Sequence, residues 1–211
     1  KTALITYPAN KTDEVYEIPE GVVEIEPYAF GYTKNLKEVV FPESTTTINE
    51  FAFCMSSLEN FNYTDSIKTV GNYAFAYTDA VKFIEINENT EFIGECAFLN
   101  FGVICVLPAS VENLAQASIY GISDMTVYYD GTEEQMAQLI ADEKIVGGGN
   151  LTVIYGESVT SNTYGDFRYI ETTDGEISIY DYNGNNKVIE IPSEINGKKV
   201  VDIRNTFTNL Q

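Results

Sequence analysis

Carboxylates are the residues of this chain whose number and spacing could support catalysis. Two carboxylates hydrolyse a glycosidic bond only when they face each other across a cleft at a defined separation. The acids of this chain are scattered over predicted turns and outer faces, so a solvated surface is the better interpretation. The chain has no histidine, which excludes Ser-His-Asp and Cys-His machinery within it. We predict no enzymatic activity and no catalytic residue, although close acidic pairs occur at Glu24/Glu26, Glu133/Glu134 and Asp142/Glu143.

One oxygen-rich stretch resembles a metal site superficially. Residues 181–185, Asp-Tyr-Asn-Gly-Asn, begin like a calcium-binding loop. An EF-hand would continue with Gly at position 186 and Glu at position 192, where this chain has Asn186 and Pro192. A plain turn is therefore favoured, and weak calcium binding near Asp181 stays open as the alternative.

The cysteines give no support for a metal or a disulfide framework. Cys54, Cys96 and Cys105 are too few, and odd in number, for a disulfide scaffold. They form no Cys-x-x-Cys pair, so a zinc site is not indicated. We interpret all three as small hydrophobic residues of the core, and we predict neither a metal nor a cofactor.

The excess of acidic residues argues against nucleic acids and anionic membranes as partners. Among 211 residues, 12 are basic and 32 are acidic, which gives a net charge of −20. Nucleic-acid binding needs clustered cations, and anionic membranes attract basic segments, so both partners are disfavoured. No apolar run approaches the roughly 18 residues of a membrane-spanning helix, so membrane insertion is not expected. Because 44% of the residues are hydrophobic, a packed core is expected.

An internal repeat decides the predicted fold. Ala-Phe pairs end at Phe30, Phe53, Phe75 and Phe98, with spacings of 23, 22 and 23 residues. Five residues before each Phe stands a branched aliphatic residue, and a decayed fifth copy places Leu114, Ser118 and Ile119 in the same phase. A fixed period of this length is the signature of a repeat architecture. The aliphatic column consists of Ile25, Ile48, Val70 and Ile93.

A second set of columns predicts one short strand per repeat. Its residues lie two apart, as residues on one face of a strand do. A unit of about 22 residues cannot bury its own face, so neighbouring units must stack into a solenoid. We expect six strands in one parallel sheet, about 24 Å long at the usual strand spacing. The two columns are Tyr16, Val39, Phe61, Ile84, Cys105 and Val127, and Ile18, Phe41, Tyr63, Ile86, Leu107 and Tyr129.

These residues resemble the BspA-like leucine-rich repeat family of bacterial surface proteins. The matching stretches are IPEGVVEIEPYAF, FPESTTTINEFAF and LPASVENLAQASI, and LITYPANKTDEVYEIP resembles a variant first unit. The resemblance implies a leucine-rich repeat solenoid, β-rich, with parallel strands stacked in repeats of about 22–23 residues. It also implies surface display, adhesion or protein interaction in place of catalysis.

The period stops after Tyr129, where an end cap is predicted. Thr132 and Gln135 form a T-x-x-Q capping box for a helix. Met136, Leu139 and Ile140 fall on one face of that helix, Gly147–149 end it, and residues 151–155 form a strand. A solenoid needs such a helix-strand C-terminal cap to cover its last layer.

A second module follows the cap. We assign residues 1–156 to the repeat array with its end cap, and residues 157–211 to a linker, a β-hairpin and the first unit of a second, truncated array. Residues 157–163 are polar, Asp174-Gly175 signals the hairpin, and Asn196-Gly197 signals a further turn. The stretch IPSEINGKKVVDI resembles a first repeat unit, and Thr206-Phe207 stands where Ala-Phe would be.

Alternation along the strands predicts an outward face with binding potential. Phe83, Ile104 and Val106 are neighbours on this face, and a solvated sheet would not favour three such residues. Either the patch is open, with Phe83 and Tyr128 as aromatic anchors, or the C-terminal helix or a neighbouring molecule covers it. The candidate face consists of Glu38, Val40, Asn60, Asn62, Phe83, Glu85, Ile104, Val106 and Tyr128.

Two functions of different classes remain at this stage. One is a non-catalytic interaction or adhesion module, secreted or on a bacterial cell surface, for an unknown protein or glycan that could come from a host. The other is a structural spacer or stalk that presents other domains. An interaction module should show a patterned, partly apolar strand face, and a spacer only a polar one. The chain begins at Lys1 without a signal peptide, so we expect a processed chain or a fragment.

Overall fold

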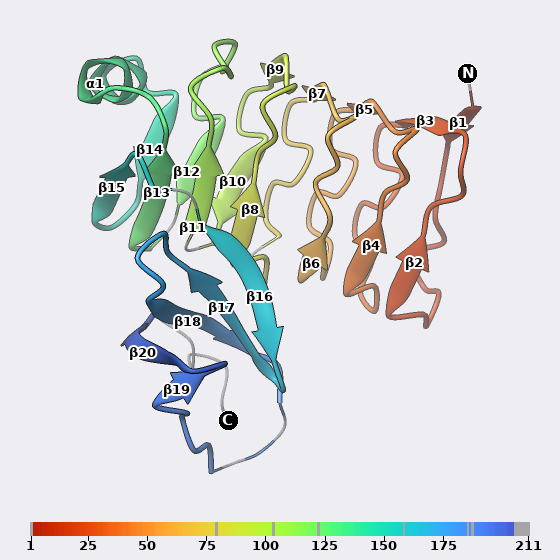
Figure 1. Cartoon of the computed structure of the whole chain (residues 1–211). Coiled ribbons are helices and arrows are strands. Elements are labelled where there is room, and N and C mark those ends of the chain that lie inside the picture. Colours follow the sequence, from red (N-terminus) through yellow and green to blue (C-terminus); the bar gives the residue numbers. More distant parts are fainter. Residues whose placement is uncertain are drawn as a thin grey trace. The chain divides into compact units, whose positions relative to one another are not determined.

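The computed structural model divides the chain into two compact units, residues 1–155 and 156–211. It describes residues 2–78, 80–102, 104–121, 123–157, 159–184, 186 and 188–204. The first unit contains the repeat array, in which strands of successive coils lie side by side (Figure 1).

Parallel strands line both sides of the array. On one side, a five-stranded sheet takes one strand from each early coil, and a three-stranded sheet continues the stack. On the other side, the strands fall into a three-stranded and a four-stranded sheet. The strands of the first side are β1 (Thr2–Leu4), β3 (Val22–Ile25), β5 (Thr47–Ile48), β7 (Thr69–Val70) and β9 (Phe92–Ile93), then β10 (Phe98–Phe101), β12 (Ile119–Gly121) and β14 (Ile145–Gly147). Those of the second side are β2 (Val15–Glu17), β4 (Glu38–Val40) and β6 (Asn60–Phe61), then β8 (Phe83–Glu85), β11 (Ile104–Leu107), β13 (Met125–Tyr129) and β15 (Leu151–Tyr155).

The predicted leucine-rich repeat solenoid is therefore confirmed, with one difference in the second side. We expected six strands in a single sheet, and the structure has seven strands in two sheets, divided between β6 and β8. Strand β6 is only two residues long. There the ring of Phe61 stacks on the core ring of Phe75, with centroids 4.6 Å apart.

The Ala-Phe repeat forms the centre of the core. Phe30, Phe53, Phe75 and Phe98 are fully buried. Their rings stack nearly parallel, with centroid distances of 4.7, 4.9 and 5.3 Å along the array. Tyr7, in the variant unit before the first Ala-Phe coil, extends the stack onto Phe30 at 5.3 Å. One aromatic ring per coil thus fills the interior from the first coil to the fourth.

The alanine of each pair has a backbone role. The N–H of each core aromatic residue donates to the carbonyl of the alanine in the next coil. Phe30 N–H donates to Ala52 O at 2.7 Å, and Phe53 N–H donates to Ala74 O at 2.7 Å. In the fifth coil Ser118 takes this place, since Phe98 N–H donates to its carbonyl at 2.9 Å. The alanine side chain is small enough to stay buried beside the stack.

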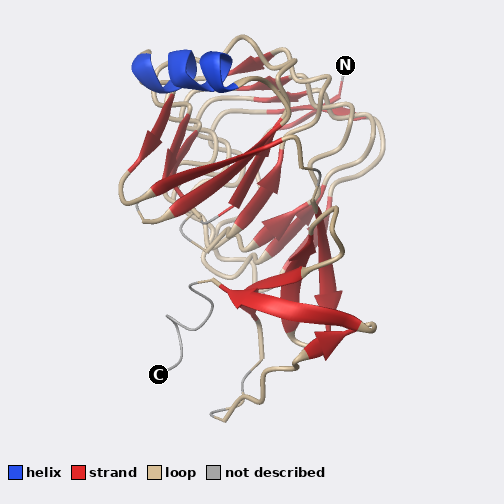
Figure 2. Ribbon diagram, turned by 60° about the vertical axis from the view of Figure 1, so that its left-hand side comes forward, coloured by secondary structure: helices blue, strands red, loops and turns tan. Residues whose placement is uncertain are grey.

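The end cap agrees with its sequence signals in outline. Helix α1 (Glu133–Ala141) starts at Thr132, whose hydroxyl accepts from Gln135 N–H while the Gln135 side chain accepts from Thr132 N–H. The helix contacts β14 and is the coiled ribbon of Figure 2. Met136 is buried and Leu139 packs on the core, as predicted.

Three details of the cap and the cysteines differ from prediction. Ile140 is exposed, because a nine-residue helix lying on the surface turns this position toward solvent. The helix ends at Ala141, before the glycine run, and the first glycine of that run, Gly147, is the last residue of strand β14. Cys54 and Cys105 are buried, but Cys96 is only partly buried, because it sits at a corner with φ 50°.

The second unit is a five-stranded sheet with its own small core. Its strand order is β16-β17-β18-β20-β19. Tyr169, Ile177, Ile179 and Ile195 form the buried cluster. The strands are β16 (Thr160–Tyr164), β17 (Phe167–Glu171), β18 (Ile177–Tyr182), β19 (Glu194–Ile195) and β20 (Lys198–Ile203).

Both predicted turns of this unit are present, and one prediction was wrong. β17 and β18 pair antiparallel around Gly175, and β19 and β20 pair around Asn196 and Gly197, where all three turn residues have positive φ. The polar stretch 157–163 is not all linker, because β16 begins at Thr160 and pairs with β17. Alternating polar residues can occupy an edge strand. The predicted Thr206-Phe207 unit lies outside the described residues.

We expect Phe53→Ala to destabilise the array by about 3–5 kcal/mol, because it removes a ring packed between two others and leaves a cavity. The free energy of unfolding from urea titrations would measure this loss. Phe92→Ala is the matched control, since Phe92 is partly exposed on β9. Equal losses for the two variants would contradict the central role of the stack.

Candidate functional site

The strand registers place the predicted outward residues in two rows, which we call the strand face. Val15, Glu38 and Asn60 are direct neighbours on β2, β4 and β6. On the other sheet, Phe83 pairs with Ile104, and Glu85 pairs with Val106, which pairs with Tyr128. The strand parity was therefore predicted correctly. The structure does not join the two halves of the face by strand pairing between β6 and β8.

The prediction that Ile104 and Tyr128 are open to solvent was wrong. They are 0% and 1% exposed. The reason is visible in β11 and β13, whose sequences Ile-Cys-Val-Leu and Met-Thr-Val-Tyr-Tyr carry apolar side chains at almost every position. Such continuous runs are typical of strands buried on both faces. Neither residue can serve as a surface anchor.

Asn62 has a structural role that the sequence did not indicate. Its side-chain Oδ1 accepts from Phe41 N–H at 2.7 Å, and its Nδ2 donates to Phe41 O at 2.9 Å. The amide thus continues the ladder between coils beyond the end of β6. Although Asn62 is exposed, both ends of its amide are engaged with the preceding coil.

The remaining residues of the strand face form a mixed surface. Glu38, Val40, Asn60, Phe83 and Val106 are half-buried. Strands β2, β4, β8 and β11 therefore each present a partly exposed apolar side chain, with that of Val15 the most exposed at 52%. The face is patterned and partly apolar.

Glu85 is an acid of this face whose pKa is displaced from its ordinary value. Burial of its carboxyl, and secondarily the charge of Asp65, raise the pKa of Glu85 above its ordinary value. The charged form is therefore disfavoured in the folded state. This is a cost that the fold carries at neutral pH.

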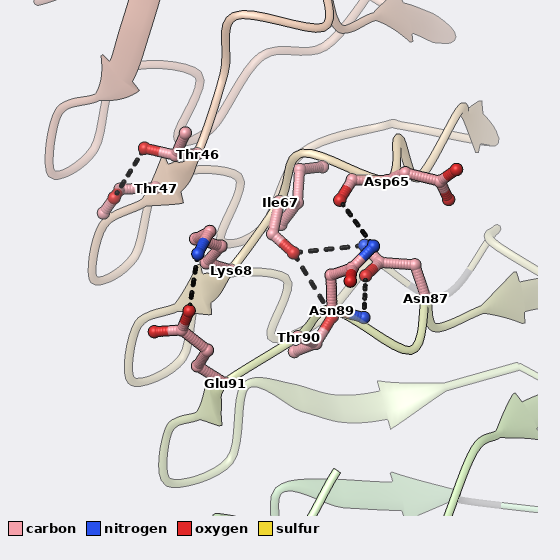
Figure 3. Close-up of polar contacts among 9 residues, drawn as sticks. All are labelled: Thr46, Thr47, Asp65, Ile67, Lys68, Asn87, Asn89, Thr90 and Glu91. Atoms are coloured by element: carbon pink, nitrogen blue, oxygen red, sulfur yellow. Dashed lines mark hydrogen bonds and ion pairs between the residues drawn. The ribbon is translucent and has the colours of Figure 1, made fainter. Parts of the chain in front are cut away.

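A polar cavity lies beside the strand face, on the loops between the two sides of the array (Figure 3). Its volume is about 440 Å³. Lys68 Nζ pairs with Glu91 Oε1 at 2.6 Å, and Asn87 Nδ2 holds the loop by donating to Thr64 O and Ile67 O. The lining consists of Asp65, Lys68, Glu88, Asn89, Thr90, Glu91, Ser110, Glu112 and Asn113.

This cavity is lined by groups that can accept hydrogen bonds. Its carboxylates, amides and hydroxyls come from the same loop positions of successive coils, such as Asp65, Glu88 and Ser110, spaced 23 and 22 residues apart. Each polar residue taken alone reads as an ordinary turn residue, so the sequence did not predict this cavity. The repeat spacing of these residues was the one signal that could have indicated it.

The described residues hold no group of three or more acids or cysteines placed to bind a metal ion. Asp181, the start of the superficial calcium motif, lies in β18 with its carboxylate 3.8 Å from the guanidinium of Arg168. An extended strand with a neighbouring cation differs from an oxygen-rich turn. The predicted plain turn is therefore wrong at Asp181 and Tyr182, which both lie in β18. In the described part of the chain, no helix has the length and apolar character to cross a bilayer.

We expect Glu85→Gln to stabilise the protein at neutral pH by at most about 1 kcal/mol, the scale for partly solvated charges. Because the folded pKa is raised, the wild type loses stability as pH rises through the window from the unfolded value to the folded value. Urea titrations from about pH 4 to pH 7 should show the two proteins converging at low pH. Glu20→Gln controls for the loss of one surface charge, and an identical gain there would contradict the assignment.

Comparison with known proteins agrees with this geometry. The model of the BspA type leucine-rich repeat region matches residues 9–126, more than half of the chain, as six copies. No curated protein matches the sequence.

Two solved structures share the fold. A leucine-rich cell surface protein from Faecalibacterium prausnitzii A2-165 is 26% identical, with a TM-score of 0.56 over 64% of this chain and 37% of its own. The pneumococcal vaccine antigen PcpA is 18% identical, with a TM-score of 0.52 over 72% of this chain and 44% of its own. The chain thus spans less than half of either structure. With the repeat columns, the stacked core and the family match in agreement, this chain belongs to the BspA type leucine-rich repeat family.

Proposed function

We propose that the array is a non-catalytic interaction module, secreted or displayed on a bacterial cell surface, that binds a protein or glycan through the open part of the strand face. The observation that carries this proposal is the partial exposure of one apolar side chain on each of β2, β4, β8 and β11. Val15, Val40, Phe83 and Val106 each present apolar surface among acids and amides.

This pattern favours binding over a purely structural spacer. A spacer needs only a solvated outer face, whereas partly exposed apolar residues rimmed by polar ones mark interaction sites. Strand registers set Val40 beside Glu17 and Val106 beside Glu85, so a partner would meet apolar side chains next to acids at the strand spacing of about 4.8 Å. The spacer reading remains the alternative if this face proves inert.

Phe83 is the aromatic anchor in this proposal. It is half-buried on β8, between the acid-rich early strands and the apolar later ones. Glu85 on the same strand supplies a polar rim. Buried Tyr128, the other aromatic expected at the sequence level, has no part in the revised face.

The surface location and the domain organisation rest on likeness. The Faecalibacterium prausnitzii structure is that of a leucine-rich cell surface protein, and the absence of histidine supports a non-catalytic role. We also propose that residues 157–211 open a second repeat array, on the resemblance of IPSEINGKKVVDI to a first unit.

We expect Val40→Ser combined with Phe83→Ser to abolish most adhesion of protein-coated beads to epithelial monolayers, because both changes remove apolar contact area. Val15 is left intact so that the first coil is undisturbed. Thermal melting would confirm that the variant is folded before beads are counted.

The matched control is Phe92→Ser, which removes a partly exposed Phe from β9 on the other side of the array. Adhesion should persist in this control. If wild type and the strand-face variant adhere equally, or if neither adheres, the strand face is not the binding surface and the spacer function is favoured.

A further inference from the structure

Two columns of large side chains occupy an unusual backbone conformation at one corner of the array. They lie two residues before and two residues after each buried core Phe. All have positive φ, between 55° and 61°. We call these six residues the aromatic corner: Tyr28, Phe51 and Tyr73 in the first column, and Tyr32, Met55 and Tyr77 in the second.

The backbone explains the conformation but not the side chains. At the corner, the amides of Phe51, Phe53 and Met55 all donate to carbonyls of the next coil, at 3.0, 2.7 and 2.9 Å. Left-handed residues let the chain turn while these alternate amides stay aligned. Bulky side chains are disfavoured there, and Gly or Asn would fit at lower cost.

Later coils show that the corner does not need bulk. In the same two columns the fourth coil carries Cys96 and Asn100, and the fifth carries Ala117, all with positive φ. The fold thus accepts small or polar residues at these positions. The backbone turn therefore does not require the aromatic and methionine residues of the early coils, and strained residues of this kind gather at functional sites.

Four of the six side chains of the aromatic corner are exposed, and Phe51 and Tyr73 are half-buried. Tyr28, Tyr32, Met55 and Tyr77 are between 41% and 56% exposed. The rings of the first column stack in parallel, with Tyr28 to Phe51 at 4.9 Å and Phe51 to Tyr73 at 5.1 Å. The second column is tied across coils by Tyr32 N–H to Cys54 O and Met55 N–H to Ala76 O, at 3.0 and 2.9 Å.

We propose that the aromatic corner docks a protein segment that presents arginine side chains. Stacking covers ring faces in the first column, so the exposed rings of Tyr32 and Tyr77 in the second column are the ones that can receive a guanidinium group. Tyrosine and methionine are typical of protein interfaces, where methionine adapts to irregular partners. Guanidinium groups lie well on aromatic rings and pair with carboxylates through two hydrogen bonds.

Charge selects a basic partner over a second copy of this chain. Residues 1–155 carry 7 basic and 23 acidic residues, a difference of −16. Two such surfaces repel each other. Exposed Glu50 and Glu95 flank the corner, and Tyr73 OH donates to Glu95 Oε1 at 3.3 Å. One cation, Lys34, lies two residues beyond Tyr32, so the acidic end near Glu95 is the more favourable for arginine.

Methionine methyl groups give a direct test. The chain has three methionines, of which Met55 is 48% exposed while Met125 and Met136 are buried. An octa-arginine peptide, titrated at about 0.15 M salt, should shift the ¹³C-methyl resonance of Met55 saturably and leave the other two unmoved. Octa-lysine, with equal charge but weaker ring stacking, should bind less tightly. Binding that leaves Met55 unmoved, or equal binding of the two peptides, would overturn the proposal.

Double variants distinguish octa-arginine binding at the aromatic corner from non-specific attraction to the acidic surface. Tyr32→Ser with Tyr77→Ser should weaken octa-arginine binding about tenfold, the effect of two lost cation–ring contacts. Tyr155→Ser with Tyr164→Ser removes two exposed tyrosines elsewhere and should leave binding unchanged. Equal weakening of both folded double variants would refute the proposal. The strand-face variant should retain octa-arginine binding, so the two surfaces can fail independently.

Discussion

The structure depends on one constraint: a coil of about 22 residues cannot bury its own apolar face, so every layer of the core must be shared with the next coil. Two interactions meet this constraint together. Phenylalanine rings stack from coil to coil at 4.7–5.3 Å, and the amides beside them donate across the same step. Ring and amide occupy the same residue, so side-chain packing and backbone pairing share one period.

This coupling explains which features the sequence predicts. The Phe column and the aliphatic column keep their phase because each residue must meet its counterpart one coil away, and all eight residues are buried. The capping box at Thr132 and the turn at Asn196 are local signals, and both are present. Tyr7 shows that even a variant coil can be recognised, since its ring continues the stack onto Phe30.

The functional surface was less accessible to sequence reasoning, for physical reasons. Parity tells which side of a strand a residue occupies, but not whether that side meets solvent, and so Ile104 and Tyr128 were misjudged. The continuous apolar runs around them were the available signal. The polar cavity depends on loops of three coils, and the aromatic corner depends on φ values. Neither loop proximity nor a left-handed backbone is encoded in hydrophobic periodicity.

Core positions and corner positions within one coil differ in how freely their side chains can vary. Core columns tolerate little, because the ring of Phe53 is packed between Phe30 and Phe75. Corner positions two residues away share the same hydrogen-bond ladder, yet they hold Tyr, Phe, Met, Cys, Asn or Ala in different coils. The amides of Phe51 and Met55 hydrogen-bond to the next coil, whereas the side chains at these positions vary from coil to coil. Backbone bonds thus fix the geometry while leaving exposed side chains free to specify partners, and a binding surface can be placed on these corners without altering the core.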